Sequence, residues 1–176
     1  TDENGEFISG ITVGKNYVCI AENKLYTYHA ENFDLTDVKV FSKPYNLDIK
    51  LQPIPKKETI EPTAPIILQN IFFNTGSADL LPESSQEIAL ISNMMSENKN
   101  ISIQIIGHTD DVGNDADNQL LSEQRAKAVA TAIIAKGISP DRIQSIGKGE
   151  TQPIAENTSD EGRRKNRRTE MLVKIQ

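Results

Sequence analysis

The sequence is poor in the residues that would place it in several common classes of protein. It has no tryptophan, a single cysteine and only 5% aromatic residues. One cysteine cannot form a disulfide within the chain, so Cys19, in the apolar run 17–20, is predicted to be a small buried thiol. No run approaches the ~20 apolar residues that span a bilayer, and no basic-then-apolar signal segment opens the chain. Because it starts at Thr1 rather than Met, we expect a processed or trimmed fragment.

An excess of basic charge is also missing. The net charge is -6 over 176 residues, and an acidic chain repels a polyanion at long range, which argues against nucleic-acid binding. The one basic cluster, residues 163–168, has no interleaved aromatic residue on which a base could stack. We expect that cluster to be a solvated helix face, with one Arg turned toward ligand or core.

Motifs for metal binding and catalysis are lacking as well. The acidic segment Asp111 to Asn118 has neither the ligand spacing with a turn glycine nor the closing glutamate that a calcium loop requires, so no metal or other cofactor is predicted. His108, Asp110 and Ser122 form the one nominal triad, but Ser122 has no nucleophile-elbow context. We interpret Ser122 as a helix-start residue and predict that the protein is not an enzyme.

Four prolines within residues 53–65 predict an extended, semi-stiff linker. The linker would separate a small all-β domain, residues 1–52, from a larger domain, residues 66–176. In the first, the β-prone runs 17–20, 25–28 and 47–51 alternate with turn residues. Residues 1–7 and 14–17 resemble the second half of a carboxypeptidase-regulatory-like β-sandwich, which implies a spacer or accessory fold.

The pattern after the linker alternates between strands and helices. It predicts a strand over 66–73, a helix from Pro82 to Met95 and a strand over 101–105. A polar loop over 107–118, a long helix ending at Gly137, and strands over 142–146 and 171–175 follow. The predicted fold class is therefore α/β, a β-α-β-α-β-β sandwich with helices packed on a mixed sheet, preceded by the partial β-sandwich.

Two side chains stand out on physical grounds. Asp110 follows the buried strand 101–105 in a glycine-flanked turn, and strand ends project functional groups from a rigid base. Arg125 shares a helical row with Leu121 and Val129, so it either snorkels or meets an anion. Because a β-loop-α unit folds the helix back over the strand, we expect the two to converge. The pair could bind a zwitterion, or could form a plain internal salt bridge.

Four spaced motifs carry a resemblance to a known family. They are Gly107-His108-Thr109-Asp110-x-x-Gly113, Asn118-x-x-Leu121-Ser122-x-x-Arg125-Ala126, Gly147-x-Gly149-Glu150-x-x-Pro153 and Gly162-Arg163-x-x-Asn166-Arg167-Arg168-x-Glu170. In this order, over about residues 66–176, they resemble the OmpA C-terminal family. The resemblance implies a non-catalytic module that binds peptidoglycan and anchors an outer-membrane protein or lipoprotein to the cell wall.

The resemblance also implies roles for particular residues. Asp110 and Arg125 would grip the amino and carboxylate groups of diaminopimelate on the stem peptide. Further ligand-binding residues would surround them: Thr109, Asn118, Leu121, Phe73, Asn74 and Arg167 or Arg168. The implied location is the periplasm of a Gram-negative bacterium, in association with the outer membrane, where outer-membrane proteins would be further partners.

Overall fold

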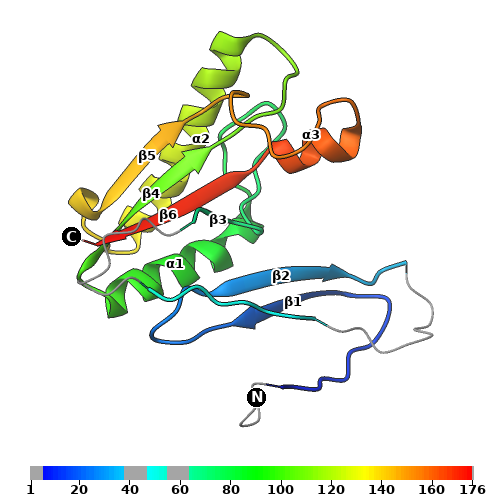
Figure 1. Ribbon diagram of the computed structural model, residues 1–176, viewed down its shortest axis with the longest axis vertical. Coiled ribbons are helices and arrows are strands. Elements are labelled where there is room, and N and C mark those ends of the chain that lie inside the picture. The colour runs from blue at the N-terminus through cyan, green and yellow to red at the C-terminus, as the bar shows by residue number, and fades with distance from the viewer. Residues whose placement is uncertain (1–5, 38–46, 55–63, 176) are drawn as a thin grey trace.

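The computed structural model describes residues 6–37, 47–54 and 64–175 (Figure 1). Its elements in chain order are β1 (Asn16–Ala21), β2 (His29–Asp34), β3 (Ile66–Ile67), α1 (Ser85–Glu97), β4 (Ile101–Gly107), α2 (Asp115–Ala135), β5 (Ile143–Gly147), α3 (Asp160–Asn166) and β6 (Thr169–Ile175). Short 3-10 turns, Pro82–Ser84 and Pro140–Arg142, precede α1 and β5. The predicted mixed α/β fold is confirmed, with α3 added before the last strand.

The larger sheet has the strand order β3-β6-β4-β5. β4 and β5 are parallel, and the other neighbouring pairs are antiparallel, so the sheet is mixed. In β4 the alternating Ile101, Ile103 and Ile105 are buried, as their spacing predicts for a half-buried strand. Side chains between them face the opposite side, where Gln104 contacts Gln144 at 3.3 Å. One face of the sheet is therefore apolar and the other mainly polar, although Ile106 and Leu172 also lie on the second face.

Helices α1 and α2 cover the apolar face of the sheet (Figure 1). Ile91 and Met95 of α1 and Val129 and Ile133 of α2 are fully buried among the strand residues. Their three- and four-residue spacing gives each helix one apolar stripe, which the sheet removes from water. After α2 the chain turns at Gly137, whose φ of 94° is the left-handed conformation typical of a helix C-terminus.

The first strand of the larger sheet is much shorter than the predicted strand 66–73. β3 holds two residues, and the Leu68 N–H adds one hydrogen bond to β6. Asn70 then turns inward and donates to the Glu87 carboxylate of α1 at 2.9 Å. The prediction was wrong because this buried polar bond draws the chain from the sheet edge to α1, and Phe73 forms only an isolated bridge.

Helix α2 begins inside the segment that we predicted to be loop. Its N-cap is Asn114, whose side chain accepts the Asp117 N–H at 2.8 Å. This cap satisfies one of the free donors in the first helical turn. Ser122 lies within the helix and is fully buried, so its interpretation as a helix-start residue was wrong.

The described N-terminal residues form an antiparallel hairpin of β1 and β2. The second strand lies at His29–Asp34 rather than at 25–28, where Tyr26 makes only an isolated bridge to Pro53. Residues 47–51 do not form the predicted strand, and Cys19 is half-buried rather than buried. The likeness to a carboxypeptidase-regulatory-like domain and the division at 53–65 remain predictions, and most of that segment, 55–63, lies outside the described residues.

The hairpin lies against α1 and shares its apolar core (Figure 1). Tyr28, Ala30 and Ile54 belong to the same buried cluster as Ile88 and Ile91 of α1. A two-stranded hairpin is marginal on its own in water, so this packing supplies the apolar burial that it needs. Within the described residues, none of the helices combines the length and apolar character needed to cross a bilayer.

Candidate functional site

Asp110 lies where the chain leaves the C-terminal end of β4. Two backbone hydrogen bonds hold this exit: His108 N–H donates to the Arg168 carbonyl at 3.0 Å, and Thr109 N–H donates to the Gly149 carbonyl at 2.9 Å. Asp110 is only 7% exposed, and its Oδ1 accepts the Val112 N–H at 3.2 Å. The carboxylate is therefore held by its own turn, which is a common arrangement for an Asp in a loop.

Glycines allow α2 to approach the ends of β4 and β5 closely. Gly107 and Gly147 are partners in the parallel pair, and both lie beneath Ser122. A Cβ on Gly107 would overlap the Ser122 carbonyl oxygen, and one on Gly147 would lie 2.5 Å from the Glu123 backbone nitrogen. The Ser122 hydroxyl accepts the Gly149 N–H at 2.9 Å. This contact brings the N-terminal half of α2 over the loop that carries Asp110.

Asn118 braces the loop from the first turns of α2. Its side-chain Nδ2 lies 3.3 Å from the Asp110 carbonyl oxygen, 3.3 Å from the Val112 carbonyl oxygen and 2.6 Å from Glu150 Oε2. Asn118 is 6% exposed. The three acceptors belong to two loops, so this amide joins the β4–α2 loop to the segment after β5.

Arg125 faces the same region from further along α2. Its Nε donates to the Ser77 carbonyl oxygen at 2.9 Å, and its guanidinium carbon lies 5.1 Å from the centre of the Phe73 ring. Such a distance is typical of a cation–π contact. The side chain is half-buried, and the described residues make no recorded hydrogen bond to its two Nη atoms. The segment from Phe73 to Ser77, including exposed Asn74, thus forms a wall beside Arg125.

The ion-pair partner of Asp110 is Arg167, not Arg125. Arg167 follows α3 directly, and its Nη1 donates to Asp110 Oδ2. Buried Asn166 fixes this position, because its Oδ1 accepts the backbone N–H groups of Ile154 and Ala155 at 2.8 and 3.0 Å. Asp110 and Arg125 therefore lie in one charged cluster with a third residue, Arg167, which forms the ion pair with Asp110.

Arg168 points into the protein rather than toward Asp110. Its Nε donates to Glu170 Oε1 at 2.7 Å, and its Nη2 donates to the Gln152 carbonyl at 3.0 Å. Nearby His108 is 2% exposed; its Nε2 is 3.4 Å from Glu170 Oε2 without hydrogen-bond geometry. Burial, and then the charge of Arg168, lower the pKa of His108, although Glu170 opposes them. These residues form a support beneath the Asp110 loop.

The cluster of Asp110, Arg125 and Arg167 combines one negative and two positive charges. Burial, and then repulsion from Arg167, lower the pKa of Arg125, while attraction to Asp110 opposes them. An arginine side chain keeps its proton in proteins, so the cluster has an excess of one positive charge. It is suited to a ligand with at least one carboxylate, which a guanidinium can hold in a bidentate manner, and with an ammonium group for Asp110.

The sequence analysis did not identify several contacts of this cluster. Ser77 and Glu150 contribute through a carbonyl oxygen and a carboxylate, and Glu150 could have been found from its motif after β5. Leu121 is half-buried, and Thr109 is buried with a hydroxyl that has no hydrogen-bond partner among the described residues. No group of three or more His, Cys, Asp or Glu side chains in the described ranges is arranged to hold a metal ion.

Comparisons with known proteins agree with the motifs and the fold. The OmpA family model matches residues 72–167. Outer membrane protein A of Bordetella avium is 36% identical over 120 residues, which are 68% of this chain and 62% of that protein. Peptidoglycan-binding protein ArfA of Mycobacterium tuberculosis strain H37Rv is 37% identical over 103 residues, 58% of this chain and 32% of ArfA. The chain thus spans less than two thirds of the length of these relatives.

A solved structure has the same fold. The cell wall anchor of the T6SS from Pseudomonas aeruginosa superimposes with a TM-score of 0.53 and 29% sequence identity. The superposition covers 60% of this chain and 76% of that one. The similarity therefore concerns part of this chain and not the whole of it.

Proposed function

Because the chain belongs to the OmpA family, we propose that it binds peptidoglycan non-covalently and anchors a cell-envelope protein to the wall. Relatives named as a peptidoglycan-binding protein and as a cell wall anchor support this proposal. Relatives from the outer membrane support a location in the periplasm of a Gram-negative bacterium, associated with that membrane. The role is binding rather than catalysis, and other outer-membrane proteins are candidate partners.

The finer part of the proposal concerns the stem peptide. Arg125 takes a carboxylate of diaminopimelate and Asp110 takes the amino group on the same carbon. The observation that carries this assignment is the charge cluster at the end of β4, where Arg125 and Asp110 lie close enough for their charges to interact. Arg125 is held by the hydrogen bond from its Nε to Ser77 and by its contact with the Phe73 ring. Its two Nη atoms are therefore left to bind a carboxylate.

The remaining residues surround Asp110 and Arg125. Arg167 holds Asp110 before the ligand arrives and then supplies a second positive charge for the peptide. Asn118 and Thr109 set the loop, and Phe73 lies beside Arg125, with Asn74 next to it in the chain and Leu121 four residues before Arg125 on α2. Arg168 is a support for the site, because three of its donors are bound within the fold. A cluster of three charged side chains suits one peptide, so anchoring gains from many copies and from tethering.

Purified sacculi test the proposal directly. Asp110→Ala and Arg125→Ala should each abolish retention of the chain in a sedimentation assay, because each removes one half of the grip. Truncating one partner of a buried charge pair costs roughly 2–5 kcal/mol, or roughly 30-fold or more in affinity. Asp111→Ala and Arg164→Ala remove the same charges at exposed neighbouring positions and should leave retention unchanged.

The same assay separates the alternative reading of the cluster. If the Asp110–Arg167 pair only stabilises the fold, Asp110→Ala would lower the melting temperature and leave retention by sacculi intact. Retention of both Asp110→Ala and Arg125→Ala at the wild-type level would overturn the grip. Soluble fragments released from the sacculi would instead indicate an enzyme.

A further inference from the structure

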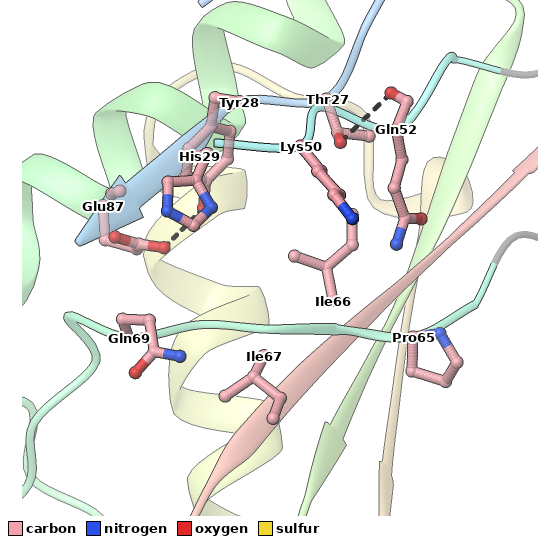
Figure 2. A pocket seen from close by; sticks show the side chains of 11 residues that line it. Thr27, Tyr28, His29, Lys50, Gln52, Pro65, Ile66, Ile67, Gln69 and Glu87 are labelled. Carbon is pink, nitrogen blue, oxygen red and sulfur yellow. Dashed lines mark hydrogen bonds between the residues drawn. The ribbon is translucent and has the colours of Figure 1, made fainter. Parts of the chain in front are cut away.

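One buried carboxylate joins the N-terminal hairpin to the larger part of the protein. Glu87 of α1 is 2% exposed. Its Oε1 accepts the Tyr28 hydroxyl at 2.7 Å, and its Oε2 accepts the Asn70 side-chain amide at 2.9 Å. The Asn70 Oδ1 in turn accepts a hydrogen bond from the side-chain amide of Asn32 in β2. Figure 2 shows Tyr28 and Glu87 facing each other beside the start of β2.

Burying the Glu87 carboxylate costs free energy, so its hydrogen bonds must be kept to offset that cost. A carboxylate removed from water is tolerated only where its oxygens receive hydrogen bonds. Both oxygens of Glu87 have a donor, and each donor comes from a different chain segment. Tyr28 is 7% exposed and Asn70 is also 7% exposed, so water does not easily replace either one. The position of Asn70 is thus fixed jointly by the hairpin and by α1.

The segment that starts at Asn70 ends at the candidate site. Two residues further on, the backbone of Phe72 is bound at both ends to the Ser84 hydroxyl, which accepts its N–H at 2.9 Å and donates to its carbonyl at 3.1 Å. The next residue, Phe73, carries the ring that lies against the Arg125 guanidinium. Residues 70–73 therefore connect the hairpin network to the ligand-binding arginine over a short, doubly anchored stretch.

We propose that the N-terminal hairpin is a working part of the ligand site, in which Tyr28, Asn32 and Glu87 hold residues 70–73 and so position Phe73 against Arg125. This inference rests on the proposed function. It assigns Glu87, Tyr28 and Asn32 as positioning residues that never touch the ligand. It also gives a role to the region of the chain that the family match, residues 72–167, does not include.

The physical reason for this positioning role is that two contacts orient the Arg125 side chain. Its Nε bonds to the Ser77 carbonyl and its guanidinium carbon lies 5.1 Å from the centre of the Phe73 ring, and both residues belong to the loop that follows residue 70. A bidentate bond to a carboxylate requires the guanidinium plane to be set correctly. If Asn70 loses its fixed place, Phe73 and the Ser77 carbonyl gain freedom, and the guanidinium must be ordered by the ligand at the cost of affinity.

A cavity beside the Glu87 network should allow a variant that lacks the Tyr28 hydroxyl to fold. It has a volume of about 290 Å³ and is lined by residues that include His29, Lys50, Gln69 and Glu87 (Figure 2). When the Tyr28 hydroxyl is removed, water entering from this cavity can solvate the carboxylate. We therefore expect Tyr28→Phe to fold. Asn32→Ala should fold as well, because the Asn32 side chain is exposed.

The test uses the full chain, intact sacculi and the nitrogen resonance of the Arg125 side chain. In the Tyr28→Phe/Asn32→Ala double variant we expect sacculi to be bound roughly 2- to 30-fold more weakly, which is the range for a coupling carried through packed residues. The Arg125 Nε–H signal should shift at the same time, because its bond to Ser77 loosens. A general loss of stability would not move that signal in the folded protein.

Ser92→Ala is the matched control for this test. Ser92 lies on α1 like Glu87, is 4% exposed, and its hydroxyl donates within the helix to the Ile88 carbonyl at 2.7 Å. It should leave both sacculus binding and the Arg125 signal at wild-type values. A double variant with unchanged Arg125 signal and unchanged binding overturns the positioning role.

Failure of the underlying function would look different. In that case Asp110→Ala also binds sacculi like the wild type, whatever the hairpin variants do. A shifted Arg125 signal in the double variant, with weakened sacculus binding and no retention of Asp110→Ala, supports the inference together with the proposed function.

Discussion

Among the described residues, two buried carboxylates have surroundings that differ in charge. Glu87, beneath the N-terminal hairpin, is bound by the neutral donors Tyr28 and Asn70. Asp110, at the end of β4, is bound by the charged side chain of Arg167. The donors also differ in exposure: Tyr28 is 7% exposed, whereas the Arg167 side chain is 46% exposed. A partner of the first kind stays in place, and a partner of the second kind can be exchanged for a ligand group.

This difference separates a structural contact from a binding site. The Glu87 network has a donor for each carboxylate oxygen and adds no net positive charge. The Asp110 cluster has two guanidiniums for one carboxylate, so an added carboxylate improves its charge balance. A fully satisfied polar network rigidifies a fold, while a cluster with unused donors attracts a partner. Only the second is therefore proposed to meet the cell wall.

The largest change, a loss of unfolding free energy in the site region, is expected from Gly147→Ala. The site region depends on backbone contact between the β5 end and α2, and the new Cβ would lie 2.5 Å from the Glu123 nitrogen. Overpacking of this kind costs about 1–3 kcal/mol of unfolding free energy. Urea unfolding measures it, with Gly10→Ala as control, because a Cβ there has no neighbour within 4 Å. Equal stability of the two variants would show that α2 can move away without cost.

A smaller effect is expected from pH, which should change the stability contributions of Glu87 and of His108 in opposite directions. Burial raises the pKa of Glu87, so the folded state binds its proton more tightly than the unfolded state does. The contribution of Glu87 to stability is therefore greatest below its ordinary pKa of 4.5 and decreases as pH rises through the folded-state pKa. Burial instead lowers the pKa of His108 from 6.5, so its contribution decreases as pH falls below 6.5 toward the folded-state pKa.

Unfolding free energies of Glu87→Gln and His108→Gln, each subtracted from the wild-type value between pH 4 and 8, measure the two contributions. The wild-type advantage over Glu87→Gln should shrink as pH rises, and the advantage over His108→Gln should shrink as pH falls. Parallel curves for the two variants would mean that the two buried groups are not opposed in this way.

The smallest effect is expected from salt. The Asp110 cluster is partly open to solvent, so screening should weaken sacculus binding a few-fold between low and physiological ionic strength. The loss should be far less than for a protein that binds a phosphate polymer. The stability difference between wild type and Tyr28→Phe should not respond, because that network is buried. Binding independent of salt would place the ligand on apolar walls rather than on the charge cluster.

Sequence patterns predicted most of the larger sheet, because its signals are local. Alternating isoleucines in 101–105 mark a half-buried strand whatever they pack against. The predicted strand 66–73 failed because Asn70 turns toward a carboxylate 17 residues further along the chain. Likewise, Ser122 has the residue type of a helix cap, yet it lies inside α2, where it bonds to Gly149 of another loop.

The candidate site was predicted as a set of residues and not as a pattern of bonds. Asp110 and Arg125 were selected by strand end and helix row, and the structure places Asp110 after β4 and Arg125 on α2, close enough for their charges to interact. The choice between Arg167 and Arg168 could not be made from two adjacent arginines. It depends on which of them faces Asp110 when α3 ends at Asn166, whose buried side chain fixes the turn.

The sequence by itself determined the alternation of strands and helices, the family and the charges available to bind a ligand, because each depends on residue type and spacing. Only the tertiary structure decided that Asp110 pairs with Arg167, that Arg125 is held by Phe73 and Ser77, and that the hairpin packs on α1 through Glu87. Those contacts join residues that are far apart in the chain, and they form only when burial of the shared core brings the segments together.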